Sequence, residues 1–248
     1  MPVAEGMVIK TNTKRVREAR KVNLELLLSN HNRECTSCER SGNCELQRLS
    51  DEIGIRNIEF IGEKTVKPVD TSSPSIVRDP SKCILCGRCI SVCSKVQGVS
   101  AIGFRNRGFR TTVGPIFDKG LGEVDCINCG QCIINCPVGA LKEKESIDYV
   151  WDAIEDSSKY VIVQTAPAVR AALGEEFGLP IGTRVTGKMA AALRRMGFDK
   201  VFDTDFGADL TIMEEGFELL DRLQNGGKLP MVTSCSPGWI KYCEHFHP

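Results

Sequence analysis

Two cysteine runs of identical spacing constrain this chain more than any other feature. Each run has the pattern C-x2-C-x2-C-x3-C, and Pro137 follows the second. The runs comprise Cys83, Cys86, Cys89 and Cys93, and then Cys126, Cys129, Cys132 and Cys136. Thiolates are soft ligands, and this spacing wraps them around one cube of iron and sulfide. The runs therefore predict two 4Fe-4S clusters.

The fourth cysteine of each run is predicted to bind the cluster of the other run, as in two-cluster ferredoxins. One cluster is then held by Cys83, Cys86, Cys89 and Cys136, and the other by Cys126, Cys129, Cys132 and Cys93. Zinc usually takes C-x2-C pairs that a longer loop separates. Disulfides need an oxidising compartment, and the sequence shows no signal-peptide pattern. Both alternatives are therefore weak.

Composition limits the remaining function classes. The 248 residues suffice for two or three small domains. The net charge of zero predicts no nucleic acid or other polyanion as a partner. No apolar run approaches the ~18 residues that a membrane helix needs. The 13 cysteines indicate a reduced, cytoplasmic protein that uses thiolates as metal ligands.

A third cluster site is predicted upstream of the two runs. Cys35, Cys38 and Cys44 alone would leave a cubane one ligand short, and His31 lies four residues before Cys35. A lone histidine is more often a surface residue, but here the ligand count closes. Three clusters need twelve ligands, and the eleven cysteines up to Cys136 plus His31 supply them. We therefore expect a 4Fe-4S cluster with one histidine and three cysteine ligands.

Periodicity predicts the elements around these sites. Residues 13–29 should form a helix with Val16, Ala19, Leu26 and Leu27 as its apolar contacts. A short helix should place Leu46, Leu49 and Ile53 over the histidine-ligated cluster. Residues 1–10 are expected to be a single strand, the last of a missing domain, and residues 62–80 have linker composition. The glycine-rich interval between Cys93 and Cys126 predicts an extended hairpin and loop.

The pattern changes after residue 148. Strands are predicted at 160–164, 200–203 and 229–233, the first of them buried, with helices at 187–196 and 208–224 between them. The second helix should carry one apolar face made of Leu210, Met213, Phe217 and Leu220. Alternation of strand and helix at these lengths predicts a right-handed parallel βαβαβ unit.

The carboxyl ends of such strands are where ligand sites form. Thr165–Ala168 and Ser234–Trp239 occupy that edge, so Cys235 lies where chemistry usually happens. From the sequence pattern, Cys235 is either a reactive thiol or an ordinary buried thiol. Glu215, Glu218 and Arg222 share one helical face, which is either a solvated polar surface or a proton relay leading to Cys235.

Three of these segments resemble the start of the catalytic domain of iron-only (FeFe) hydrogenases: Thr165–Ala168, Phe206–Glu215 and Thr233–Trp239. The histidine-containing site and the two cysteine runs resemble the accessory-cluster domains of the larger members. The resemblance covers essentially the whole chain, in family order. It implies reversible reduction of protons to dihydrogen at an H-cluster, a 4Fe-4S cube joined to a diiron subsite, with accessory clusters that wire it to external carriers.

The resemblance also implies residue roles and partners. Cys235 matches the proton-transfer thiol, Glu215 and Glu218 match the relay carboxylates, and Arg222 matches a residue near the relay exit. The segment that packs on the diiron ligands corresponds to Ala166, Pro167 and Ala168. Redox partner subunits or ferredoxin are expected, with a flavin- or NAD(P)-binding subunit among them.

Three departures from the family pattern qualify that expectation. The family commonly has two adjacent cysteines, the second ligating the catalytic cube, and here that position is Ser236. Serine is tolerated, or Cys235 is the ligand instead, or the cube is held in another way. The later family motifs do not occur before Pro248, and residues 1–10 stand where a plant-type 2Fe-2S domain would end. We therefore expect these 248 residues alone to bind three cubanes without turning over hydrogen.

The predicted fold is α+β. Residues 1–10 are expected to be the last strand of a missing 2Fe-2S domain, 11–77 a histidine/cysteine-ligated cluster domain plus linker, 78–147 a two-4Fe-4S ferredoxin-like domain, and 148–248 the first part of an H-cluster domain. The alternative is a non-catalytic electron-transfer subunit of a formate dehydrogenase or complex I-like enzyme. A molybdopterin enzyme should show another cysteine cluster after residue 148, and none occurs before Cys235.

Overall fold

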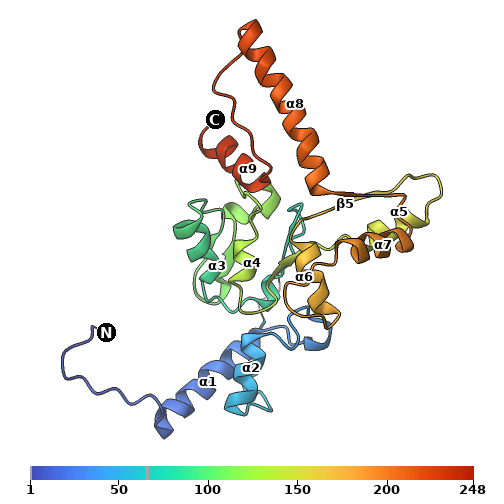
Figure 1. Cartoon of the computed structure of the whole chain (residues 1–248). Helices are drawn as coiled ribbons and strands as arrows, with labels where there is room; N and C mark the ends of the chain where they lie inside the picture. The colour runs from blue at the N-terminus through green and yellow to red at the C-terminus, as the bar shows by residue number, and fades with distance from the viewer. Residues whose placement is uncertain (1, 65–66) are drawn as a thin grey trace. The chain divides into compact units, whose positions relative to one another are not determined.

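The computed structural model describes residues 2–64 and 67–248 (Figure 1). Its contacts divide the chain into two compact units. The first comprises the residues up to Glu145 together with Ser234–Pro248, and the second comprises Ser146–Thr233. All twelve predicted accessory-cluster ligands and Cys235 lie in the first unit, whereas the helix that carries Glu215 and Glu218 lies in the second.

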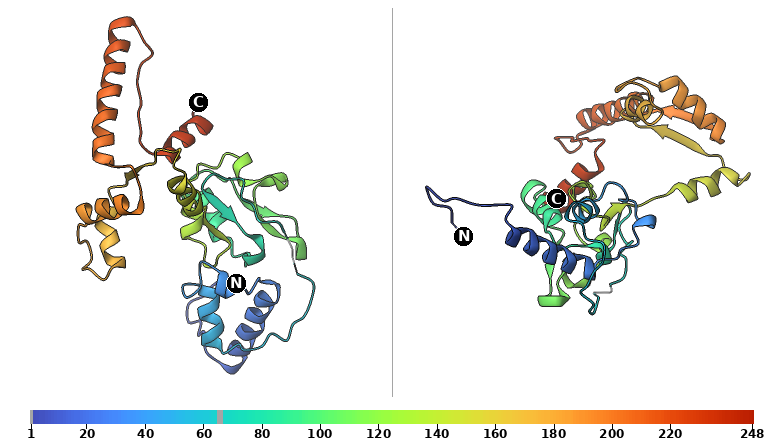
Figure 2. Two further views of the ribbon diagram at one scale, coloured as in Figure 1. Left: turned by 90° about the vertical axis from the view of Figure 1, so that its right-hand side faces the viewer. Right: turned by 90° about the horizontal axis from the view of Figure 1, so that it is seen from below.

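Two helices open the first unit, α1 at Lys14–Asn30 and α2 at Glu45–Ile53, and they lie in contact with each other (Figures 1 and 2). The Thr13 side chain caps α1 by accepting a hydrogen bond from the Val16 amide at 3.3 Å. Both helices agree with the prediction, and Leu46, Leu49 and Ile53 contribute to the core as expected.

The predicted core face of α1 is wrong. Leu24 and Glu25 are buried and Leu28 packs on the core, whereas Ala19, Leu26 and Leu27 are exposed and Val16 is half-buried. Four leucines fall within five residues near the end of this helix, at 24, 26, 27 and 28, so periodicity alone did not distinguish which of them face inward.

Two other predictions in this region need correction. Residues 2–10 form no strand, because a single extended segment finds no partner strand among the described residues; Met1 lies outside them. The predicted linker at 62–80, of which residues 65–66 also lie outside the described ranges, is ordered at its end. Strand β1 begins there, at Ile76–Arg78, and its side chains are buried.

The two cysteine runs fold together as one compact body. Strand β1 pairs antiparallel with β4 at Leu141–Glu143, and β2 at Gly103–Arg105 pairs antiparallel with β3 at Thr112–Gly114, which confirms the predicted hairpin. Short helices carry part of each run, α3 at Arg88–Ser91 and α4 at Gln131–Ile134. Each begins after a glycine with positive φ, Gly87 at 72° and Gly130 at 71°. Glycine takes this conformation without strain, so the chain turns sharply after the second cysteine of each run.

The second unit contains a parallel pair of strands, β5 at Ile162–Thr165 and β6 at Lys200–Asp203. Its helices are α5, α6, α7 and α8, at Ile147–Glu155, Val169–Glu176, Thr186–Met196 and Thr204–Asn225. The predicted strand–helix–strand order with parallel pairing is therefore present. Asp203 caps α8, because its side chain accepts a hydrogen bond from the Phe206 amide at 3.0 Å.

Two details of the second unit were predicted wrongly. Residues 229–233 form no strand in the described chain, and Pro230 lacks the N–H that a ladder position requires. Strand β5 is not buried, since its side chains alternate between exposed and half-buried positions. The apolar α8 face of Leu210, Met213, Phe217 and Leu220 is likewise exposed.

Helix α9, at Pro237–Phe246, returns to the first unit and carries Cys243. The overall result is a mixed helix–strand chain, as predicted. Within the part of the chain that the structure describes, no helix combines the length and apolar character needed to cross a membrane.

Candidate iron–sulfur sites and the Cys235 segment

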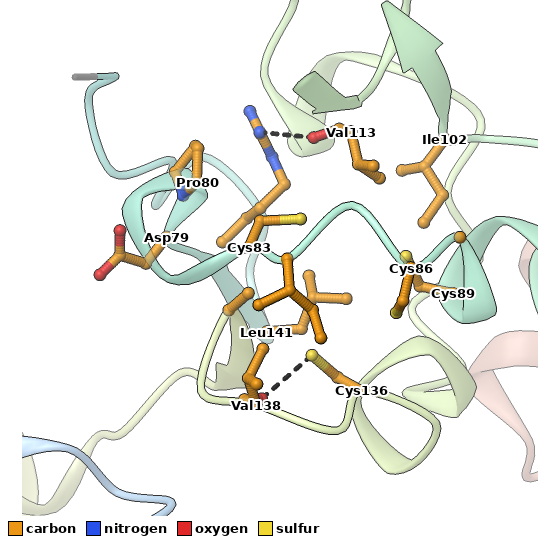
Figure 3. A pocket seen from close by; sticks show the side chains of 14 residues that line it. Asp79, Pro80, Cys83, Cys86, Cys89, Ile102, Val113, Cys136, Val138 and Leu141 are labelled. Atoms are coloured by element: carbon orange, nitrogen blue, oxygen red, sulfur yellow. Dashed lines mark hydrogen bonds between the residues drawn. The ribbon is translucent and has the colours of Figure 1, made fainter. Parts of the chain in front are cut away.

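The first cavity is lined by cysteines from both runs. Cys83 and Cys86 come from the loop before α3, Cys89 lies in α3, and Cys136 follows α4 in the second run (Figure 3). The other walls are largely apolar and include Ile84, Ile102, Val113, Val138 and Leu141. The Cys136 thiol donates a hydrogen bond to the Val138 carbonyl at 3.0 Å. The structure thus brings together the four side chains that the crossed pattern assigns to one cluster.

The second cavity repeats this arrangement with the complementary cysteines. Cys126, Cys129 and Cys132 line it together with Cys93 from the first run. Among the described residues its remaining walls are uncharged: Ile76, Gln97, Val99, Ala101, Ile102, Leu121, Ile127, Gly130, Gln131 and Leu141. Each cavity therefore holds three cysteines of one run and the last cysteine of the other.

The chemistry of these cavities fits a buried cluster. Burial raises the pKa of the Cys89 and Cys132 thiols to about 12, and it also raises the pKa of Cys83 and Cys126. These thiols are neutral when free, so they become thiolates only by binding metal and releasing protons. No three His, Cys, Asp or Glu side chains converge on a single-ion site within residues 2–64 and 67–248. A cubane does not require such convergence, because each ligand binds a different iron.

His31 has the properties of a neutral ligand. The residue is 8% exposed, and its Nδ1 is buried without a hydrogen-bond partner. Burial lowers the pKa of His31, and nearby Lys82 lowers it further. A buried nitrogen left unpaired costs free energy, and a neutral imidazole nitrogen is a common metal ligand. The orphaned atom therefore fits a missing bond to iron.

The three cysteines after His31 lie on adjoining turns. Cys35 opens a short helical turn, and the Cys38 amide donates to the Cys35 carbonyl at 3.2 Å. Cys44 stands at the N-cap position of α2. Cys35 is exposed, and the other two are half-buried.

The His31 region adjoins the first cavity. Cys44 and Cys136 line one groove, together with Arg40, Glu45 and Pro137 among others. The Glu45 amide donates to the Pro137 carbonyl at 3.0 Å, and Arg40 Nη2 donates to the Ile133 carbonyl at 3.1 Å. Ligands of two predicted clusters therefore line a single groove.

Gly139 is a part of this contact that sequence analysis missed. A Cβ at this position would lie 2.7 Å from Cys38 Sγ, which is too close for any real pair. We therefore expect Gly139→Ala to displace Cys38, costing about four irons or altering one EPR signal. Gly103→Ala is the matched control, because a Cβ there meets nothing within 4 Å. Unchanged iron content and spectra in Gly139→Ala would contradict this role.

The Cys235 segment begins helix α9. Cys235 is exposed, and Ser236 is the N-cap, its Oγ accepting a hydrogen bond from the Trp239 amide at 3.4 Å. A Cβ on Gly238 would lie 4.0 Å from Cys129 Cβ and 3.5 Å from the Ile127 carbonyl oxygen. The start of α9 therefore packs on the loop that lines the second cavity.

The other predicted catalytic residues lie in the second unit. Ala166, Pro167 and Ala168 follow β5 and lead into α6, and the Val169 amide donates to the Ala166 carbonyl at 3.1 Å. Arg222 forms an ion pair with Glu218. Glu215 is half-buried. The predicted relay joins residues of different units, so its connection to Cys235 stays a prediction.

Arg78 is a second residue at these sites that sequence analysis missed. It lies in β1, lines the first cavity, and is 8% exposed. It falls within residues 62–80, which have linker composition and carry no motif, so only the folded arrangement identifies it.

Comparison with known families finds three matches along the chain. Residues 20–59 match the NADH-ubiquinone oxidoreductase-G iron-sulfur binding region, and residues 82–140 match the 4Fe-4S dicluster domain. The family described as iron only hydrogenase large subunit, C-terminal domain, matches residues 159–248.

Individual relatives extend the similarity to the whole chain. The NADP-reducing hydrogenase subunit HndD of Solidesulfovibrio fructosivorans is 53% identical over 100% of this chain and 43% of its own length. Iron hydrogenase 1 of Clostridium pasteurianum is 43% identical over 99% of this chain and 43% of its own length. A crystal structure of an NAD+-reducing NiFe-hydrogenase in the H2-reduced state superposes with a TM-score of 0.51 at 31% identity, covering 54% of this chain and 58% of that chain. The resemblance to iron-only hydrogenases is confirmed, and the chain spans less than half the length of these two curated relatives.

Proposed function

We propose that this chain is the iron–sulfur electron-transfer portion of an iron-only hydrogenase, whose parent reaction is the reversible reduction of two protons to dihydrogen. Three 4Fe-4S clusters would be held by the His31 site and the two cavities. The observation that carries the proposal is the pair of cavities, each lined by three cysteines of one run and the fourth of the other. The unpartnered Nδ1 of buried His31 supports the third site.

The three sites support one order for the wiring. Cys44 of the His31 site and Cys136 of the first cavity line a common groove. The two cavities share Ile102 and Leu141 as wall residues. Gly238, three residues after Cys235, packs near Cys129 of the second cavity. Contacts within the first unit therefore support one order of electron transfer: the His31 site, the first cavity, the second cavity and the Cys235 segment.

The C-terminal residues would complete one wall of the catalytic centre. When bound, the H-cluster supplies the chemistry of proton reduction, and Cys235 is the proposed proton-transfer thiol. Its exposure in the described chain leaves its sulfur accessible to a proton donor. Glu215 and Glu218 are the proposed relay carboxylates, with Arg222 paired to Glu218 near the exit. Ala166, Pro167 and Ala168 are proposed to pack on the diiron ligands, and Ser236 stands at the position that matches a family cube ligand.

External electron carriers follow from the same proposal. The relative HndD is named as a subunit of an NADP-reducing hydrogenase, and the superposed NiFe-hydrogenase is named as NAD+-reducing. We infer for this chain redox partner subunits or ferredoxin, including a flavin- or NAD(P)-binding subunit, and a cytoplasmic location.

A non-catalytic subunit of a complex I-like enzyme is the competing function. The mitochondrial 78 kDa subunit of the NADH-ubiquinone oxidoreductase of Candida albicans is 33% identical over 58% of this chain and 20% of its own length. The match of residues 159–248 to the hydrogenase family favours the hydrogenase instead.

Anaerobic iron and sulfide analysis with EPR tests the proposed cluster content. The purified chain should hold about twelve irons, and His31→Ala should lose about four or change one EPR signal. His245→Ala is the matched control, because its ring lies on α9, 3.5 Å from Asp125, and is not a predicted ligand. A His31→Ala chain with unchanged iron and spectra would remove His31 from the ligand set. About eight irons in the parent chain would mean that only two cubanes form.

A further inference from the structure

We propose that Arg78 raises the reduction potential of the cluster in the first cavity relative to that of the cluster in the second. The proposal rests on the proposed function, because it requires a cluster in each cavity. It assigns an electrostatic role to Arg78, a residue that is not part of the cysteine pattern.

Arg78 is a buried charge fixed beside the first cavity. Its Nη1 donates to the Val113 carbonyl at 3.0 Å, a hydrogen bond drawn in Figure 3. Its Nε and Nη2 each lie 3.4 Å from Asp70 Oδ2. Guanidinium groups stay protonated in proteins, so this charge is permanent. Arg78 lines the same cavity as Cys83, Cys86, Cys89 and Cys136.

The two cavities differ in charge although their cysteines are equivalent. Among the described residues, no charged side chain lines the second cavity. The first cavity has two, Arg78 and Asp79. Figure 3 shows the Asp79 carboxylate directed away from the cysteine sulfurs, and Asp79 pairs with Lys82 at 3.7 Å. Among the side chains that line the two cavities, Arg78 is therefore the charge that distinguishes the first. Arg88, beside Cys89, is more exposed and pairs with Glu45 at 2.7 Å.

Reduction adds one negative charge to a cluster, so a nearby positive charge favours the reduced form. Burial strengthens the effect because little water screens it. Asp70 opposes it, but Asp70 is not among the cavity walls, and its carboxylate also accepts hydrogen bonds from the Leu121 amide at 2.9 Å and the Ser72 hydroxyl at 2.6 Å. These bonds stabilise the carboxylate independently of Arg78.

Arg105 provides a control for the charge effect. Its side chain is also poorly exposed and its guanidinium lies near that of Arg78, since a Cβ added at Gly114 would be 3.0 Å from Arg78 Cζ and 3.4 Å from Arg105 Cζ. Arg105 pairs with Asp118 at 2.9 Å and does not line the first cavity.

The test is an EPR-monitored redox titration of the purified, cluster-loaded chain. At a fixed solution potential, Arg78→Gln should lower the reduced-to-oxidised ratio of the first-cavity cluster about tenfold, as expected for the loss of one partly buried charge interaction. Asp70→Asn should raise that ratio. Arg78→Lys, which keeps the charge, should stay near the parent, and Arg105→Gln should change little. Cys83→Ala identifies the first-cavity signal by removing it.

The outcomes separate this inference from the proposed function. If Cys83→Ala removes no iron, the assignment of a cluster to this cavity fails. If the cluster is present and Arg78→Gln leaves its potential unchanged, the role of Arg78 fails. Shifts of the same sign in Arg78→Gln and Asp70→Asn would indicate a structural disturbance and also overturn it. If Arg78→Gln loses its iron, Asp70→Asn becomes the test. An unshifted potential of the first-cavity cluster in Asp70→Asn then contradicts the inference.

Discussion

Removal of the clusters from the purified chain by an anaerobic chelator is expected to unfold the region of the first unit that holds both cysteine runs. Its sheets are two antiparallel pairs of three-residue strands, which are too short to be stable alone. Its buried core includes Cys89 and Cys136 themselves. When ligands form part of the core, metal-binding free energy is also folding free energy.

Hydrogen exchange of the β1 and β4 amides measures this effect. We expect protection to fall about a thousandfold on cluster removal, about 4 kcal/mol at 1.4 kcal/mol per factor of ten. The Lys144 amide, which donates to the Ser75 carbonyl at 2.9 Å beside this strand pair, should lose protection with them. The control is the same chelator treatment followed by anaerobic reconstitution, which should restore protection. Protection that survives complete iron removal would show that the apolar core suffices.

The cluster region is the part of this chain that its sequence predicts best, because the cysteine pattern reports ligand chemistry directly. The spacing of Cys83 to Cys93 and of Cys126 to Cys136 depends on the geometry of iron and sulfide, and the structure brings together the sets that this spacing pairs. The His31 prediction relied on counting ligands, and the buried, unpaired Nδ1 supports it. Periodicity identified α1, α2, α7 and α8 because their apolar residues recur at helical spacing.

The failures concern features that depend on distant neighbours. The side of α1 that faces inward is set by its packing on α2, so Leu24 is buried and Leu26 is not. The apolar segment 229–233 reads as a strand, but no partner strand pairs with it among the described residues. Arg78 and Gly139 matter through contacts with Val113 and Cys38, which are far away in the sequence. No local pattern reports such contacts.

Substitution of the fourth cysteine of each run is expected to remove the cluster of the opposite run. Cys136 belongs to the second run but lines the first cavity, so Cys136→Ala should abolish the EPR signal that Cys83→Ala abolishes. Cys93→Ala should instead abolish the signal shared with Cys126→Ala, because Cys93 lines the second cavity. Each substitution should cost about four of about twelve irons.

The comparison is decisive because both arrangements use the same cysteines and the same iron content. Cys243→Ala is the matched control, since Cys243 lies on α9 and lines neither cavity. If Cys136→Ala and Cys132→Ala removed one common signal while Cys83→Ala removed another, each run would hold its own cluster. The crossed arrangement makes each cluster depend on both runs, because a ligand from the other run closes each cavity. Loss of either cluster should therefore loosen the packing of α3 against α4, which lie in contact.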